Sequence, residues 1–287
     1  MSDVAARYRE DGYVIVRGVF SPDEMAEMAA EADKVYAVGI SQPRTWRRQN
    51  VYFDVIDDPK AKRRIALQGH WVSWLSPILE RYRRDPRYLD ILAPLLGADI
   101  KQFGNQIHWK PPGAERVTFR YHQDYRFLGQ RMRLEDVPDN FIQTILAIDP
   151  QTAENGALKV FPGSHRLGYL GLSDEGAGYL MVGADSDDYL RGKGLDPAAA
   201  VTCEMAPGDL ILFHPLMVHG SGPNHLSHDR RIYLNGYVRA AVTGRGEWAF
   251  RDGRSVPLGP EPSIVKYDDV LTNKEVQYFD NGWAGAA

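Results

Sequence analysis

Short runs of apolar and alternating residues, separated by proline and glycine, fill much of the chain after residue 98. A clear case is Ala206-Pro207-Gly208-Asp209, which predicts a tight turn that leads into an apolar strand. Many short strands with such turns between them are typical of a β-sandwich or jelly roll. The predicted strands cover residues 99–109, 141–149, 157–161, 201–205, 210–213 and 231–240.

Helical patterns come before these strands. The segment Ser21-Pro22-Asp23-Glu24 offers a capping serine, a proline for the first helical position and a glutamate for a capping box. Asp85-Pro86 marks a second helix start, and Gly97 marks its stop. Helices gathered before the strands argue against a doubly wound parallel sheet. The pattern therefore predicts a mainly β protein with N-terminal helices (α+β).

The composition narrows the choice of partners. The chain has 287 residues, of which 44% are hydrophobic, so it can form one large domain with a sizeable core. Its net charge of −4 argues against nucleic acid as a partner, because phosphate binding normally needs a basic surface. The arginine cluster before the second helix is expected to be a solvated helix end; its members are Arg81, Arg83 and Arg84.

Cysteine content and hydropathy point to a compartment. With a single cysteine, Cys203, no intramolecular disulfide can form, and we expect a buried, inert thiol. The first residues lack the apolar core of a signal peptide, and no apolar run approaches the roughly 20 residues that span a bilayer. We therefore expect a cytoplasmic protein that contacts no membrane. The sequence leaves its oligomeric state open.

Three residues form a candidate metal site. His122 and Asp124 are two positions apart, so in an extended segment both side chains point to the same side. His219 ends an apolar stretch and can supply a third ligand. Alone, a His-x-Asp triplet is more often a loop histidine beside a capping aspartate. With His219 it matches the two-histidine, one-carboxylate triad of non-haem Fe(II) oxygenases.

A candidate co-substrate anchor follows the second histidine. Arg230 lies eleven residues after His219 and immediately precedes a predicted strand. A 2-oxoglutarate molecule that chelates iron through its keto acid end needs a fixed cation for its far carboxylate. The planar guanidinium suits this task because it pairs bidentately with a carboxylate. The alternative is an ordinary surface arginine beside Asp229.

The motifs keep one order along the chain. They are His122-Gln123-Asp124, Glu154-Asn155-Gly156-Ala157-Leu158-Lys159-Val160-Phe161-Pro162-Gly163-Ser164-His165, Pro207-Gly208-Asp209, His219-Gly220-Ser221-Gly222 and Arg230. Over residues 8–240 this string resembles the phytanoyl-CoA dioxygenase family. The resemblance implies a double-stranded β-helix, the cupin-like jelly roll, in a single domain over 1–287. Within it, 1–98 would support a core of 99–240, and 241–287 would form a C-terminal extension.

The resemblance also implies roles for individual residues. His122, Asp124 and His219 would hold Fe(II), and Arg230 would anchor 2-oxoglutarate, with Ser221 and Gln106 as further co-substrate contacts. The implied reaction uses O2 to oxidise a C–H bond of a small molecule and releases succinate and CO2. Because Asp124 is retained, hydroxylation, desaturation or ring formation is favoured over halogenation.

Several features stay open at this stage. Arg126, Arg131 and Arg133 follow the metal motif and indicate either an anionic substrate or a solvated basic loop. The segments 125–140 and 171–200, expected to govern substrate choice, match no member that we can name. His165 is interpreted as structural, whereas His108 could face the pocket or pack within its strand. Alternatives to the dioxygenase are a 2-oxoglutarate-independent cupin-type metalloenzyme and a non-catalytic jelly-roll binding protein.

Overall fold

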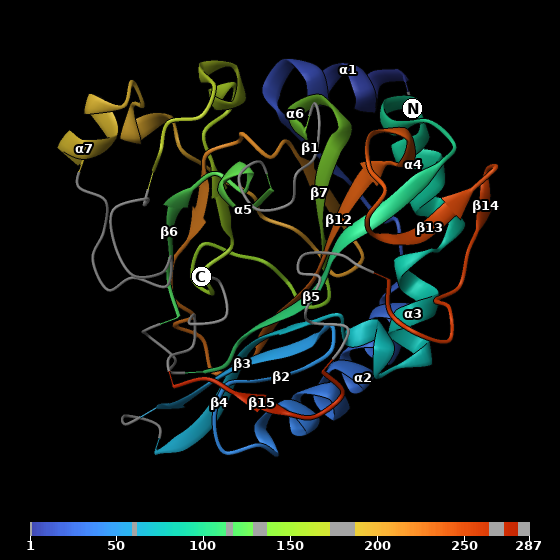
Figure 1. Cartoon of the computed structure of the whole chain (residues 1–287). Helices are drawn as coiled ribbons and strands as arrows, with labels where there is room; N and C mark the ends of the chain where they lie inside the picture. The colour runs from blue at the N-terminus through green and yellow to red at the C-terminus, as the bar shows by residue number, and fades with distance from the viewer. Residues whose placement is uncertain are drawn as a thin grey trace.

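The computed structural model describes residues 2–58, 62–112, 117–128, 137–172, 187–263 and 273–280. Within these ranges the strands form a large and a small β-sheet (Figure 1). The strands pair antiparallel. Helices lie along one face of the large sheet, and the small sheet with β6 lies on the opposite side. This arrangement confirms the predicted mainly β architecture.

The large sheet has 11 strands within the described ranges. Its main path runs in space through β1 (Tyr13–Val16), β10 (Leu210–Phe213), β7 (Phe141–Ala147), β12 (Arg230–Arg239), β5 (Ile100–Lys110), β4 (Arg63–His70), β3 (Val51–Asp58), β2 (Trp46–Arg48) and β15 (Gln277–Tyr278). Two more strands lie off this path, where β13 (Glu247–Arg251) pairs with β5 and with β14 (Arg254–Ser255). Strands from before residue 99 and after residue 240 thus share one sheet with the predicted core.

The small sheet brings two of the candidate metal ligands together. Its order is β6 (Phe119–His122), β11 (His219–Ser221), β8 (Leu158–Val160) and β9 (Val201–Thr202). Residues that face inward from the two sheets pack into one apolar cluster, which includes Ile145, Val160 and Ile232. Cys203 lies in this cluster, and burial raises the pKa of its thiol to about 12, which confirms the prediction of an inert cysteine.

Helices cover the outer face of the large sheet. They are α1 (Ser2–Asp11), α2 (Pro22–Ile40), α3 (Pro77–Arg83) and α4 (Pro86–Leu96), while the shorter α5 (Tyr125–Leu128), α6 (Val137–Asn140) and α7 (Asp187–Gly192) lie in the connections. The predicted capping box is present on α2, because Ser21 and Glu24 each bond the other's backbone N–H. Asp85 caps α4, and Gly97 ends it in a positive-φ conformation. No helix in the described ranges is long and apolar enough to cross a membrane.

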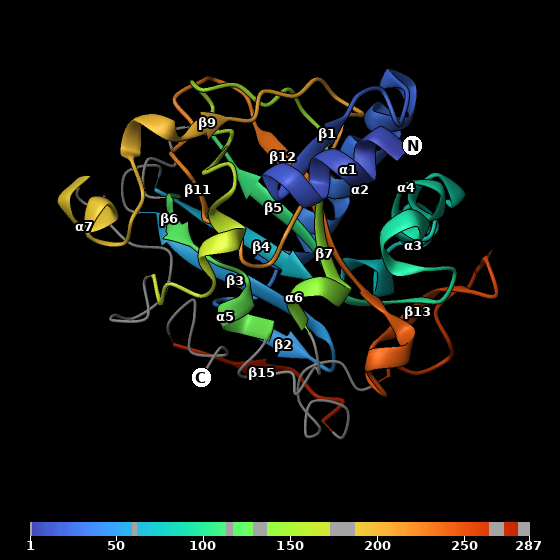
Figure 2. The ribbon, with the colours of Figure 1, turned by 90° about the horizontal axis from the view of Figure 1, so that it is seen from above.

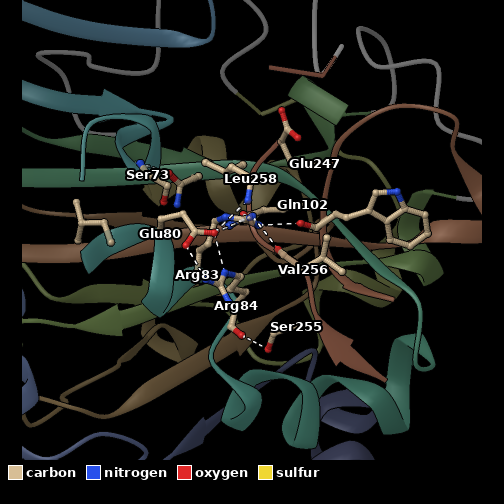
Figure 3. Close-up of polar contacts among 12 residues, drawn as sticks. Ser73, Glu80, Arg83, Arg84, Gln102, Glu247, Ser255, Val256 and Leu258 are labelled. Carbon is tan, nitrogen blue, oxygen red and sulfur yellow. Dashed lines mark hydrogen bonds and ion pairs between the residues drawn. The ribbon is translucent and has the colours of Figure 1, made fainter. Parts of the chain in front are cut away.

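Arg83 departs from the predicted solvated helix end. Its side chain is 0% exposed, against 57% for Arg81. The guanidinium donates to the carbonyl oxygens of Trp248 at 2.9 Å and Val256 at 3.1 Å, and it lies 3.4 Å from a Glu80 carboxylate oxygen (Figure 3). The reason is helical periodicity: with Leu79 and Tyr82, Arg83 occupies the stripe of α3 that faces the sheet. The prediction was therefore wrong for this residue.

Replacing this buried cation should destabilise the fold. Arg83→Met keeps most of the side-chain volume but leaves two buried carbonyl oxygens without their donors. We expect the free energy of unfolding to fall by about 2–4 kcal/mol. The exposed ion pair of Arg81 provides the matched control, and Arg81→Met should change stability by less than about 1 kcal/mol. Urea denaturation measures both, and equal effects of the two substitutions would contradict this role for Arg83.

Candidate active site

Strands β6 and β11 bring three potential metal ligands to one point. His122 ends β6, His219 begins β11, and the two residues are direct partners across the strand pair. Asp124 follows β6 by two residues. Each of the three offers one ligand atom, and these atoms all lie within 4.8 Å of one another. One Asp124 carboxylate oxygen is 3.4 Å from Nε2 of His122 and 3.6 Å from Nε2 of His219.

Backbone carbonyl groups orient both imidazoles. Nδ1 of His122 lies 2.7 Å from the carbonyl oxygen of Arg120, and Nδ1 of His219 lies 2.9 Å from that of Met217. A neutral imidazole that donates from Nδ1 leaves the Nε2 lone pair for a metal. The backbone therefore holds both rings in the tautomer that a metal ion requires at this point.

Ser164 explains part of the Pro-Gly-Ser-His motif. Its hydroxyl accepts a hydrogen bond from the backbone N–H of Val218 at 2.9 Å and donates to the Met217 sulfur at 3.3 Å. These two residues immediately precede His219, so the serine fixes the backbone that carries a ligand. His165 instead lies 3.2 Å from the carbonyl oxygen of Arg9 and outside the triad, as expected for a structural histidine.

The protonation states suit metal binding. Burial, together with the neighbouring His122, lowers the pKa of His219 to about 4. Burial alone would raise the pKa of Asp124, but His219 and His122 outweigh it and hold that pKa below its usual value. At neutral pH His219 is therefore a neutral imidazole and Asp124 a carboxylate. This donor set fits Fe(II) in a facial triad.

A pair of buried cations lies beside the triad. Arg230 begins β12 directly opposite Lys110, the last residue of β5. The Lys110 ammonium donates to the Ser221 hydroxyl at 2.7 Å and also to the Gly222 carbonyl oxygen. Ser221 is two residues beyond His219 on the same strand, so β11 links the cation pair to the triad. Lys110 was missed as a site residue from the sequence.

Neither cation has a carboxylate partner in the parts of the chain that the structure describes. The Arg230 guanidinium donates to the Gly156 carbonyl oxygen, and its Nε has no hydrogen bond within the same ranges. Burial lowers the pKa of Arg230 to about 10 and, together with the Arg230 charge, depresses that of Lys110 strongly. Unpaired buried charges are costly, so this arrangement favours an anionic ligand.

Gly156 closes the back of the cation pair. It adopts φ +75°, and a Cβ atom there would collide with the carbonyl oxygen of Gly222. Asn155 holds the preceding turn, since its side chain accepts from the backbone N–H of Thr152 at 2.8 Å. The Glu-Asn-Gly motif therefore has a steric explanation: only glycine allows this segment to approach the loop after Ser221 and to accept from Arg230.

Gln106 and His108 share the inward face of β5 with Lys110, because alternate residues of a strand point to the same side. His108 stacks on Phe119 with ring centroids 5.5 Å apart, and its Nε2 lies 2.7 Å from the Gln106 amide oxygen. Gln106 is four residues from Lys110, about 13 Å along the strand. The structure thus places Gln106 away from the cation pair. His108 lies between Gln106 and Lys110 along the strand.

A two-histidine, one-carboxylate triad in a jelly roll defines the class of non-haem Fe(II) oxygenases, and the cation pair suits those that use a dicarboxylate co-substrate. A family model described as phytanoyl-CoA dioxygenase (PhyH) matches residues 8–232. The chain therefore belongs to the phytanoyl-CoA dioxygenase family. It is a 2-oxoglutarate-dependent non-haem iron dioxygenase, as predicted, rather than a 2-oxoglutarate-independent cupin or a binding protein.

Relatives with different substrates share this similarity. A probable alpha-ketoglutarate-dependent hypophosphite dioxygenase of Stutzerimonas stutzeri is 25% identical over 81% of this chain and 77% of its own. The peroxisomal phytanoyl-CoA dioxygenase of Rattus norvegicus is 27% identical over 78% of this chain and 64% of its own. The apo structure of EctD from S. alaskensis has a TM-score of 0.66 at 23% identity and covers 93% of this chain and 87% of its own, which confirms the fold.

The neutral buried histidines predict acid sensitivity of the metal-free protein. Burial lowers the pKa values of His108, His214 and His219 to about 3, 4 and 4. Between pH 4 and 6.5 the unfolded chain binds more protons than the folded one. The contribution of these histidines to the free energy of unfolding is therefore fully present above about pH 6.5. As the pH falls below this value, each histidine lowers the free energy of unfolding by up to about 1.4 kcal/mol per pH unit.

His214 isolates one contribution, because it is not a candidate ligand. Its Nδ1 accepts from the backbone N–H of Leu216 at 3.1 Å, and Asn can supply a similar acceptor. Urea unfolding of metal-free protein at pH 7 and pH 5 should show a loss that is about 2 kcal/mol smaller in His214→Asn than in the wild type. The same loss in both proteins would show that His214 does not titrate as described.

Proposed function

We propose that His122, Asp124 and His219 hold Fe(II), and that Arg230 and Lys110, with the Ser221 hydroxyl between them and the triad, bind the far carboxylate of 2-oxoglutarate. The observation that carries this proposal is the pair of buried cations without a carboxylate partner in the described ranges. A dicarboxylate whose other end chelates the metal would compensate both charges. Gln106 stays a proposed co-substrate contact with weaker support, given its distance along β5.

The proposed reaction is hydroxylation of a C–H bond in a small molecule. When bound, Fe(II) and 2-oxoglutarate supply the oxidant from O2, with release of succinate and CO2. The chain's own residues would hold the metal through two imidazoles and one carboxylate and fix the co-substrate in one orientation. The apolar cluster between the sheets excludes water from the far side of the ligands. Asp124 occupies the position that a halide would need, which favours hydroxylation over halogenation.

We further propose an anionic group on the substrate and a cytoplasmic location. Arg126 lies on α5, two residues after Asp124, and its guanidinium carbon is 5.7 Å from the centre of the Phe127 ring. This position at the site supports an anionic substrate. Arg131 and Arg133 lie outside the described residues, as do 173–186 of the segment 171–200.

The proposed cytoplasmic location rests on the sequence pattern alone.

The metal assignment is tested by anaerobic absorbance spectroscopy. Addition of Fe(II) and then 2-oxoglutarate to the wild type should produce a visible metal-to-ligand charge-transfer band. Asp124→Ala and His219→Ala should each abolish the band, because a ligand is lost. The matched control is His165→Ala, which removes a family-motif histidine outside the triad and should keep the band. A normal band in Asp124→Ala would reject this assignment.

The co-substrate assignment is tested by titrating the same band with 2-oxoglutarate. Arg230→Gln removes a charge-assisted pair that is worth about 1.5–3 kcal/mol, so the dissociation constant should rise roughly 10- to 100-fold. Lys110→Gln should weaken binding in the same direction, while iron affinity stays unchanged in both. The exposed Arg191 on α7 provides a control, as Arg191→Gln should leave the constant unchanged. Unaltered affinity in Arg230→Gln would contradict the anchor.

The anionic substrate is tested by comparing carboxylic acids with their methyl esters. Turnover is measured as substrate-dependent succinate release. We expect the acids to be preferred, and Arg126→Gln to raise KM for the acids with a smaller effect on kcat. Equal use of acids and esters by the wild type would reject an anionic group.

A further inference from the structure

A row of polar side chains leads away from the active site across the large sheet. Asp54 on β3 is paired in register with Gln68 on β4, and Gln68 is paired with His108 on β5. Residues paired across antiparallel strands point to the same face. All three side chains therefore stand on the inner face of the sheet, which also carries Lys110 on β5 and Arg230 on β12.

The row begins at the metal site. His108 stacks on Phe119 of β6, the strand that also carries His122. The charges of Arg230, Lys110 and Asp124 all act on the imidazole of His108, so this residue lies close to the cation pair and to the triad. Gln68 and Asp54 are the next positions outward in the row.

The two outer members of the row have side-chain polar atoms without a hydrogen-bond partner in the described ranges. Asp54 and Gln68 are both 0% exposed. Thr45 donates to one Asp54 carboxylate oxygen at 3.2 Å, but the other oxygen has no partner within the described ranges. Neither the oxygen nor the nitrogen of the Gln68 amide meets the geometric criteria of a hydrogen bond there, although the amide is close enough to Asp54 to lower its pKa. Buried polar groups without partners are rare because they are costly, and a ligand that supplies the missing partners removes the cost.

The surroundings of these groups are apolar. A bulge in the β3–β4 pairing lies next to Asp54 and leaves Leu67 beside Gln68. Leu67 packs in a cluster with Phe119, and Phe127 of α5 packs against it. In Figure 2 the strands β2 to β4 lie at the same end of the molecule as β6 and α5. Leu67, the neighbour of Gln68, therefore packs against β6 and α5, the elements on either side of Asp124.

We propose that Asp54 and Gln68 form a subsite for the far end of the substrate, and that this end carries a hydrogen-bond donor, an ammonium or a hydroxyl group. The proposal rests on the proposed function. The free Asp54 oxygen and the Gln68 amide oxygen both accept hydrogen bonds. β3 is two strand spacings from β5, about 10 Å. A substrate that reaches from the metal to Asp54 is therefore an extended molecule and not a small inorganic ion.

The ionisation of Asp54 agrees with this assignment. Burial raises its pKa to about 7, although Thr45 and the neighbouring Gln68 amide act in the opposite direction. At neutral pH the Asp54 carboxyl group is therefore close to the midpoint of its titration. A bound ammonium group favours the carboxylate, whereas a hydroxyl group can donate to either form.

The test uses matched probes that differ only at the far end. These are octanoate, which ends in a methyl group, and the octanoates with a terminal amino or hydroxyl group in its place. Each probe is titrated anaerobically into the protein loaded with Fe(II) and 2-oxoglutarate, and the shift of the charge-transfer band reports binding. We expect the terminal donor to lower the dissociation constant at least tenfold relative to octanoate.

The variants assign this preference to the subsite. In Asp54→Asn and Gln68→Leu the preference for the terminal amino group should fall at least tenfold. The control is Asp57→Asn on the same strand, where the side chain is 78% exposed, and it should keep the wild-type preference. Thermal unfolding separates a structural role, because Asp54→Asn removes an unpaired buried charge and should leave the melting temperature unchanged or raised.

Each outcome decides the proposal. Equal affinity for all three probes, including undetectable binding of all three, overturns the subsite. A preference that survives in both variants overturns it as well, as does a parallel loss of affinity for every probe with a lower melting temperature. Loss of the charge-transfer band in the wild type would reject the proposed function instead, and that result is visible before any probe is added.

Discussion

Ten register pairs join β12 to β5, from Arg230 opposite Lys110 to Arg239 opposite Ile100. The pairing decides which side chains meet on each face. On the inner face it sets the two cations side by side at the end nearest Ser221. A slip by one residue would turn one strand's inner set to the other face and separate them. The proposed co-substrate pocket thus depends on the register of a single strand pair.

The outer face of the same pair carries the interactions that hold this register. The Asn105 amide donates to the Tyr233 hydroxyl at 2.6 Å and to the Asn235 side chain at 2.9 Å. The Tyr233 hydroxyl also donates to the Leu79 carbonyl oxygen of α3 at 2.8 Å. Buried, connected hydrogen bonds of this kind specify one arrangement, because a slipped register would leave them unsatisfied. The hydrogen-bond network on the outer face and the two cations on the inner face are therefore coupled, because both depend on the same register.

Local patterns were sufficient to predict some parts of the molecule. These parts involve residues that are neighbours in the chain, so the sequence alone predicts them. They are the capping box at Ser21, the alternation of His122 and Asp124, and the turn before residue 210. The third ligand, His219, came from residue chemistry and the family resemblance. The metal triad could thus be found without a structure, even though its members come from two strands.

The features that escaped prediction depend on contacts between distant segments. The sequence pattern alone indicates an ordinary lysine at the end of a strand for Lys110. Its role emerges only because β12 places Arg230 opposite it. Arg83 is predicted to be solvated, but the residue after β14 places the Val256 carbonyl oxygen against its guanidinium. No pattern in residues 51–70 indicates that β3 and β4 extend the sheet beyond β5, or that Asp54 points inward. Spacing along the chain carries little information about such pairings.

The attachment of that extension has an evolutionary consequence. β4 meets β5 through three register pairs, of which Gln68 opposite His108 is the one at the metal site. The ligands and the cation pair belong to other strands. With the proposed subsite on β3 and β4, substitutions there would alter which substrates bind without replacing a metal ligand or either cation. A lineage could then diversify its substrates through these two strands, one side chain at a time.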